Sequence, residues 1–343
     1  MNSFWFLDFR FWIGKSKSKK VFGRAICVSV FALCAVAEAQ QSGKVYRIGR
    51  LSGALSSSRF NVDTLRRELR ELGYVEGKNI AFELRNAEEK PERLSALADE
   101  LVRLKVDLII AGGPNDAMTA KKATKTIPIV FSDSSSDPVA RGLVNSLARP
   151  GGNVTGFYSM ADVLAGKRLQ VLKESIPKLS HVAVLWNPSS SDNQPQWKES
   201  QIAAHQLGLQ LHSMEVNTTD QYESAFKGAI KARSAAVAVS RHRLFTNYQK
   251  QIAELAAKYQ LPAIHFRENF VERGGLMSYG ADEVEPFKRV AVMIDKILKG
   301  AKPADIPVEQ STKFEFVINL KTAKQIGLTI APEVLARADR VIR

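Results

Sequence analysis

The stretch ERLSALADELVRLKVDLIIAGG, residues 92–113, contains the unit from which the fold can be predicted. Residues 92–106 predict a helix, and VDLIIAGG (106–113) predicts a buried strand that runs into a glycine pair. A strand that is apolar along its whole length is typical of a parallel sheet, because helices cover both faces of such a sheet. This stretch therefore favours an α/β fold.

The same alternation of strand and helix continues on both sides of this stretch. Strands are predicted near 44–52, 79–87, 127–132, 153–157, 181–188, 209–216, 235–240, 261–266 and 275–280. Helices are predicted at 61–74, from about 115, near 139–148, and at 162–176, 195–207, 220–231, 244–259 and 283–300. A further strand, 314–319, precedes a closing helical region. Right-handed crossovers between such strands give two doubly wound parallel-sheet lobes.

The glycine pair at 151–152 raises the possibility of a phosphate-binding loop. A P-loop follows a strand and carries a lysine and a hydroxyl residue behind its last glycine. Here Gly151-Gly152-Asn153 precedes the strand 153–157 and no such lysine is present. Pro150 ends the preceding segment, so a turn is predicted at this point.

The first 39 residues have the order of features found in a secretory signal. A basic segment (15–24) is followed by an uncharged apolar run (25–37) of about a dozen residues, short for a membrane span. Ala37-Glu38-Ala39 provides small residues, so cleavage is expected after Ala39, with export to the periplasm. A retained membrane anchor remains the alternative.

Cysteine usage and charge exclude several functional classes. Both cysteines, Cys27 and Cys34, lie inside the predicted signal, so the mature chain is expected to have no disulfide, thiolate metal site or cysteine nucleophile. Residues 1–39 hold six basic and two acidic residues, which leaves a net charge of +10 on the rest. The basic residues are spread along the chain without a cluster, so nucleic acid is not an expected partner.

Eight segments resemble the substrate-binding proteins of ABC transporters with the type I periplasmic binding fold, the group that includes binders of tryptophan and other amino acids. These segments are RELGYVEGKNI, ERLSALADELVRLKVDLIIAGG, DPVARGLVNSLARPGGNVTG, KRLQVLKESIPKLSHVAVLWNP, IAELAAKYQLPAI, FVERGGLMSYG, DKILKGAKPADIPVEQSTKFEFVINLKTAKQIGLTI and LARADRVI. The resemblance covers residues 45–343 almost continuously. It implies a solute receptor that works with an ABC permease, without cofactor or metal, and we expect it to be a monomer.

The resemblance also implies a division into lobes joined by a three-strand hinge. After the signal peptide (1–39), the expected lobes are 40–158 with 282–307, and 159–281 with 308–343. The chain is expected to pass between the lobes near 157–160, 279–283 and 305–314. Such a hinge restricts motion to opening and closing, so a ligand that contacts both lobes would stabilise the closed form.

In open α/β sheets ligands bind beyond the carboxyl ends of the strands, so the residues just after each strand are the candidate ligand-binding residues. The strand ends offer hydroxyl groups, amide donors and aromatic rings, which suit a small polar molecule. The candidates are Ser52, Ser56, Gly113, Pro114, Asn115, Asp137, Tyr158, Asn187, Arg241, His242, Phe266 and Tyr279.

SRHRLF (240–245) departs from the family pattern. Relatives often carry an aspartate or asparagine there, suited to a ligand ammonium group, whereas this chain has Arg241, His242 and Arg243. An inward-pointing Arg241 would favour a carboxylate or another anion, whereas an outward-pointing one would be a solvated helix start.

Enzymes and ligand sensors are two further functional classes to which such a fold can belong. The five histidines show neither metal-ligand spacing nor a nucleophile elbow, so an enzyme is not expected. A periplasmic ligand sensor that partners a signalling receptor remains an alternative to transport.

Overall fold

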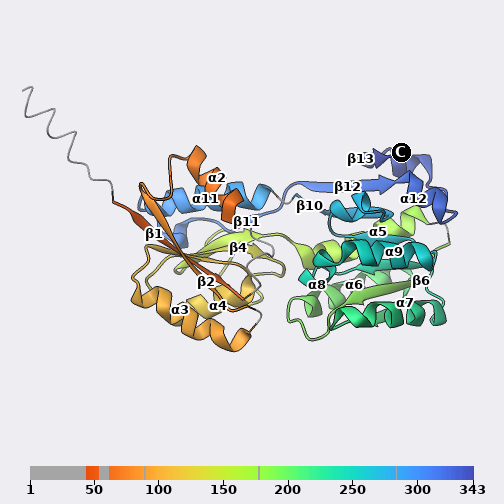
Figure 1. The fold of residues 1–343 in the computed structure, drawn as a ribbon, viewed down its shortest axis with the longest axis horizontal. Helices are drawn as coiled ribbons and strands as arrows, with labels where there is room; N and C mark the ends of the chain where they lie inside the picture. Colours follow the sequence, from red (N-terminus) through yellow and green to blue (C-terminus); the bar gives the residue numbers. More distant parts are fainter. Residues whose placement is uncertain (1–43, 54–61, 89, 177, 283) are drawn as a thin grey trace, which may run out of the picture. The chain divides into compact units, whose positions relative to one another are not determined.

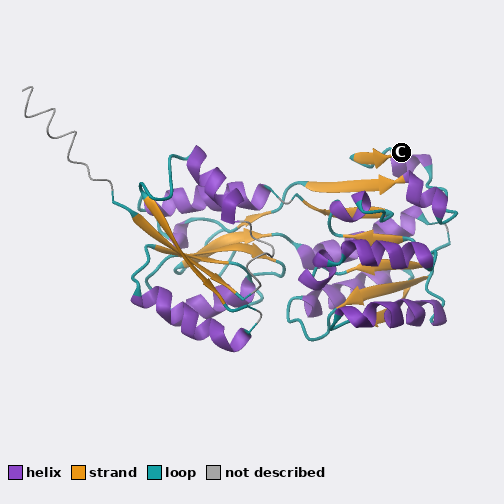
Figure 2. Cartoon of the chain, viewed as in Figure 1, coloured by secondary structure: helices purple, strands orange, loops and turns teal. Residues whose placement is uncertain are grey.

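The computed structural model describes residues 44–53, 62–88, 90–176, 178–282 and 284–343. These residues form two β-sheets, each covered by helices (Figures 1 and 2). The predicted signal peptide lies outside the described residues. No helix of the described part is long and apolar enough to cross a membrane.

The first sheet has six strands in the order β11-β5-β4-β3-β1-β2, and every neighbouring pair is parallel. Its strands are β1 (Tyr46–Ser52), β2 (Ile80–Asn86), β3 (Leu108–Ala111), β4 (Ile129–Ser134), β5 (Val154–Tyr158) and β11 (Glu309–Gln310). Its helices are α2 (Val62–Glu71), α3 (Leu94–Arg103), α4 (Pro114–Ala123) and α11 (Glu285–Leu298), with 3₁₀ turns at Pro91–Arg93 and Pro303–Asp305. Helices α3 and α4 cover one face of the sheet, and α2 and α11 cover the other (Figure 1).

The second sheet has seven strands in the order β13-β12-β10-β9-β8-β6-β7. Its strands are β6 (His181–Trp186), β7 (Gln210–Glu215), β8 (Ala236–Val239), β9 (Ala263–His265), β10 (Met277–Ala281), β12 (Phe314–Asn319) and β13 (Arg340–Ile342). Its helices are α5 (Ala161–Ser175), α6 (Asn193–Leu207), α7 (Tyr222–Lys231), α8 (Arg243–Asn247), α9 (Gln249–Lys258), α10 (Asn269–Glu272), α12 (Leu320–Gln325) and α13 (Pro332–Leu335), with a 3₁₀ turn at Thr219–Gln221. Among the described strands of this sheet, β10 and β12 form the one antiparallel pair. Strand β12 follows the third passage of the chain between the sheets.

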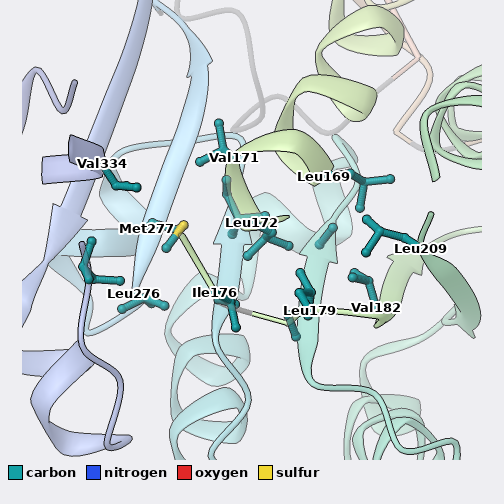
Figure 3. Packing of buried hydrophobic residues seen from close by; sticks show 14 of the residues in the cluster. Leu169, Val171, Leu172, Ile176, Leu179, Val182, Leu209, Leu276, Met277 and Val334 are labelled. Carbon is teal, nitrogen blue, oxygen red and sulfur yellow. The ribbon is translucent and has the colours of Figure 1, made fainter. Parts of the chain in front are cut away.

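Apolar residues at helical spacing fix α5 against the second sheet. Leu169 and Leu172 point from α5 toward Val182 of β6 and Met277 of β10, and all four side chains are fully buried (Figure 3). A separate core on the other face of this sheet is built around α7 and α9. Burial of a side chain of this size contributes about 1.5–3 kcal/mol, so these contacts hold α5 rigidly in place.

The chain passes between the two sheets three times, as predicted. It leaves β5 for α5 at 159–160, leaves β10 for α11 at 282–284, and leaves β11 for β12 at 311–313. The third pass places β11 beside β5, with Glu309 opposite Phe157, a few residues beyond the boundary predicted at 307.

The helix predicted near 139–148 is wrong, because this segment is a series of turns. The carboxylate of Asp137 accepts hydrogen bonds from the backbone amides of Val139, at 2.8 Å, and Ala140, at 3.4 Å. These bonds close a tight turn, and Gly142 continues it with a φ of 69°. The turn predicted at Gly151 is confirmed: its φ is 76°, in the left-handed region that glycine adopts without strain.

Candidate ligand-binding pocket

One pocket is lined by residues from both sheets. Its polar side chains come from the end of β4 and the residue after β5, from α5, from the loops after β8 and β9, and from the residue after β10. These residues are Ser132, Asp133, Ser159, Arg168, Arg241, Arg267 and Asp282. The empty space measures about 580 Å³, its open mouth included, which is the size of a site for a small molecule.

The apolar part of the pocket lining includes Ala161 and Leu164 at the start of α5, Phe266 after β9, Ala281 at the end of β10, and Pro286 and Phe287 at the start of α11. Two phenylalanine rings beside several arginines suit a ligand with an apolar body and a charged end.

An ion pair between Arg241 and Asp133 joins the two sheets across this pocket. Nη1 of Arg241 donates to Oδ1 of Asp133 at 3.0 Å and to Oγ of Ser159 at 2.5 Å, and Nη2 donates to Oδ2 of Asp133. The two charged side chains retain 17% and 19% exposure. A bidentate pair with little solvent access is stronger than a surface ion pair, so it contributes to holding the two sides of the pocket together.

A bulge in β4 positions Asp133. The pairing of β4 with β5 shifts register between Phe131 and Ser134, and Asp133 lies in the irregular segment. Bulges of this kind turn a side chain out of the regular alternation of the strand. The carboxylate is thereby available to Arg241 at the carboxyl end of the sheet.

Two buried amide side chains position the backbone of Arg241. The carbonyl oxygen of Arg241 accepts hydrogen bonds from Nδ2 of Asn193 at 2.9 Å and from Nε2 of Gln196 at 3.0 Å. Its amide donates to Oε1 of Gln196 at 2.6 Å. Asn193 and Gln196 are both fully buried at the start of α6, so the loop after β8 is tied to that helix.

Arg168 is the most unusual side chain of the pocket lining. It is only 2% exposed, in the middle of α5, and its Nη1 donates to the carbonyl oxygen of Tyr279 at 3.5 Å. Its Nη2 has no hydrogen-bond partner among the described residues. Burial, and after it repulsion from Arg241, lowers the pKa of Arg168 to about 9, which still leaves the side chain charged at neutral pH.

Aromatic stacking and a close backbone approach fix Phe266 at the pocket. Its ring stacks on the buried ring of His265 with centroids 4.2 Å apart. Strand β10 passes so close that a Cβ at Gly280 would lie 2.0 Å from the carbonyl oxygen of Phe266, which explains why this pocket residue is a glycine. Burial lowers the pKa of His265 well below its ordinary value, with Arg267 and Arg168 adding to the effect.

A second group of contacts connects the two sheets outside the pocket. Nδ2 of Asn115 donates to Oγ of Ser191 at 3.0 Å, and Nη2 of Arg141 donates to Oδ1 of Asn115 at 2.6 Å. Nη1 of Arg141 lies 3.5 Å from Oδ1 of Asp192. The carboxyl ends of the two sheets therefore contact each other at two places.

Of the twelve candidate residues predicted from the sequence, the structure places Arg241 and Phe266 in the pocket lining. Tyr158 and Tyr279 lie beside it: the hydroxyl of Tyr158 donates to Asp162 at 2.7 Å, and the carbonyl oxygen of Tyr279 is the acceptor for Arg168. Ser56 falls outside the described residues.

The remaining seven candidates lie at strand ends but outside the described lining, and several have structural roles. Gly113 and Pro114 lie at the start of α4. Asp137 accepts a hydrogen bond from the backbone amide of Val139 and so closes the turn that follows Asp137. Nδ1 of His242 accepts a hydrogen bond from the backbone amide of Leu244. Asn187 bonds through its amide to Asn193, Asn115 reaches Ser191, and Ser52 is buried at the end of β1.

Sequence reasoning missed Arg168 and Asp133. Arg168 lies within a predicted helix, whereas the candidate residues were those at strand ends. A detectable signal existed, because Leu164, Arg168 and Leu172 are spaced by four residues and so share one buried face of α5. Asp133 lies within β4, and the irregular pairing of this strand that accompanies its place at the pocket has no signal in the sequence.

The fold and the pocket together define a two-lobe binding protein for a small molecule. Residues 56–342 match the family model of the ABC transporter substrate-binding proteins, and this chain belongs to that family. Its members are extracytoplasmic solute-binding proteins of the type I periplasmic binding fold and are not enzymes.

Named relatives and solved structures agree with this assignment. A tyrosine-binding protein of Clostridioides difficile is 27% identical over 76% of this chain and 74% of its own length. The structure of an ABC domain in complex with L-Trp from Streptococcus pneumonia is 26% identical, with a TM-score of 0.75 over 87% of this chain and all of that one. The ligand-free, open structure of a substrate-binding protein with adhesive properties from Clostridium difficile is 25% identical, with a TM-score of 0.65 over 87% of this chain and 99% of that one.

Proposed function

We propose that this protein is the solute receptor of an ABC importer, which captures an amino acid or a related organic acid by lobe closure and delivers it to a membrane permease. The lobes proposed to move are residues 40–158 with 282–310, and residues 159–281 with 311–343, because β11 (Glu309–Gln310) belongs to the first sheet. The observation that carries the proposal is a pocket lined from both sheets and crossed by the Arg241–Asp133 ion pair. A ligand held between two lobes stabilises their closed arrangement by the free energy of its contacts to both.

The comparisons support a ligand with an aromatic or similarly apolar body. Two relatives that are 27% and 26% identical to this chain are named as a tyrosine-binding protein and as an ABC domain in complex with L-Trp. The present structure has a higher TM-score with the L-Trp complex, 0.75, than with the ligand-free, open protein, 0.65. This difference is in keeping with contacts between the lobes at the pocket and at Asn115.

Native mass spectrometry tests the proposal. We expect the protein, purified without refolding, to carry a small molecule that is released on denaturation. Its removal and return should change the radius of gyration measured by small-angle X-ray scattering, with the smaller value in the ligand-bound state. A radius that is the same with and without the bound molecule would reject capture by closure.

Export is part of the same proposal. We propose that the chain is cleaved after Ala39 and works in the periplasm as a monomer. The intact mass of protein from its native host should then correspond to a chain that begins at Gln40. A mass that still includes residues 25–37 would reject cleavage at this site.

A further inference from the structure

Arg168 carries an unmet requirement for an anion. A buried guanidinium needs a counter-charge and several acceptors, because transfer of a charge out of water is costly. Arg168 has only 2% exposure, a long bond of 3.5 Å to one carbonyl oxygen, and an Nη2 without a partner among the described residues. Arg168 lines the pocket, so a bound ligand can supply what the protein does not.

Both aspartates of the pocket lining already accept hydrogen bonds from other groups of the protein. The carboxylate of Asp133 is held by both terminal nitrogens of Arg241. Oδ1 of Asp282 accepts hydrogen bonds from the amides of Val284, at 2.6 Å, and Glu285, at 2.9 Å, at the start of α11. The carboxylate of Asp133 is therefore engaged through both oxygens, and that of Asp282 through one of its two oxygens.

The lining is also positively charged as a whole. Within the described part of the chain it has three arginines, Arg168, Arg241 and Arg267, and two aspartates, Asp133 and Asp282. A monoanion would balance this excess, whereas a zwitterion would leave it and would also need an acceptor for its ammonium group.

We propose that Arg168 binds the carboxylate of the solute, and that the solute is a monoanionic organic acid with an apolar or aromatic body rather than a zwitterionic amino acid. The carboxylate accepts hydrogen bonds from the guanidinium of Arg168, and the apolar body lies among Phe266, Phe287 and Leu164. This inference rests on the proposed role as a solute receptor and specifies its ligand class.

Three small probes with the same ring separate the ligand classes. The compounds are 3-phenylpropanoate (carboxylate only), L-phenylalanine (carboxylate and ammonium) and 2-phenylethylamine (ammonium only). Calorimetric titration of the ligand-free protein should show the order 3-phenylpropanoate, then L-phenylalanine, with no measurable binding of the amine. Equal or tighter binding of L-phenylalanine would overturn the monoanion assignment, as would failure of all three compounds to bind.

The variant Arg168→Met tests the residue itself. Loss of a charge-assisted bidentate bond should weaken 3-phenylpropanoate binding at least about tenfold and up to about a hundredfold. Arg168→Lys keeps the charge but lacks the bidentate guanidinium, so its affinity for 3-phenylpropanoate should lie between those of wild type and Arg168→Met. The matched control is Lys167→Met, at the neighbouring residue of α5. Lys167 donates from Nζ to Gln170 and lies outside the pocket lining. This variant also loses one positive charge, and it should bind 3-phenylpropanoate as tightly as wild type.

Thermal unfolding without ligand distinguishes a ligand contact from a structural role. Replacement of a buried, incompletely paired arginine by an apolar side chain of similar length should leave the unfolding midpoint unchanged or raise it by about 2–4 °C. An unchanged affinity of Arg168→Met for 3-phenylpropanoate would overturn the inference. Unfolding midpoints below that of wild type in both Arg168→Met and Arg168→Lys would also overturn it, because they would show that Arg168 has a structural role. The proposed receptor function is tested separately, because a retained solute in the wild-type protein would still be found by mass spectrometry.

Discussion

Arg241 and Arg168 line the same pocket in opposite circumstances. Arg241 lies on a loop after β8, and its guanidinium meets a carboxylate and a hydroxyl from the other sheet. Arg168 lies in the middle of a helix packed against the second sheet, and its Nη2 meets no acceptor among the described residues. The loop arginine connects the two sheets, whereas the helix arginine retains hydrogen-bonding capacity for another molecule.

An arginine in a cleft is therefore not automatically a ligand-binding group. Sequence reasoning selected Arg241 because of its place after a strand, and its fork is occupied by Asp133 in the structure. Arg168 would be unfavourable in a protein without a ligand, so its presence points to function rather than stability. Three changes test this contrast between the two arginines.

The largest effect on stability is expected from Asp133→Ala. It leaves Arg241 mostly buried without its counter-charge and should lower the free energy of unfolding by about 2–3 kcal/mol. The double variant Asp133→Ala/Arg241→Met should recover most of that loss, because no unpaired charge remains. Chemical denaturation of the ligand-free proteins measures both values. Additive losses in the double variant would show that the two residues are not coupled.

A smaller effect is expected from Asn193→Ala. This change removes the donor to the carbonyl oxygen of Arg241 and the acceptor for the amide of Asn187, both inside the protein. The expected loss is about 2 kcal/mol, because the buried amide of Asn187 loses its acceptor and the carbonyl oxygen of Arg241 keeps only the bond from Gln196. Gln194→Ala, the exposed neighbour on α6, should stay within about 0.5 kcal/mol of wild type. Equal stabilities of the two variants would show that Asn193 does not hold this loop.

The smallest effect is expected in the pH dependence of stability at His265, which lies near Arg168. Its pKa in the folded protein is well below the ordinary 6.5, so the unfolded chain binds more protons below that pH. Stability should therefore fall as the pH drops below about 6.5, by at most about 1.4 kcal/mol per pH unit from this residue. His265→Asn should flatten the slope of unfolding free energy between pH 6.5 and 5.

The exposed His205 provides the control for this measurement. His205→Asn makes the same substitution at a histidine whose side chain is exposed at the end of α6, and its slope is the reference for His265→Asn. A slope in His265→Asn as steep as in wild type would assign the acid sensitivity to other groups.

The alternation of strands and helices, the two mainly parallel sheets and the three passes between them could be predicted from the sequence. These follow from local apolar patterns and from turn residues such as Gly151, which act over a few residues. The predicted helix near 139–148 failed because Gly142, with a φ of 69° in the left-handed region, ends the turn that begins at Asp137. The antiparallel β12 depends on the return path of the chain and has no local signature.

The set of polar residues that meet at the pocket depends on contacts between residues far apart in the sequence. Asp133 and Arg241 are separated by 108 positions, and their pairing depends on a bulge in one sheet and on buried amides that hold a loop of the other. Arg168 is buried because α5 packs its apolar face on the second sheet and carries the arginine with it. Local patterns fix strands and helices, whereas the partners of a charge are set by residues distant in the sequence, and these partners determine whether it serves the fold or a ligand.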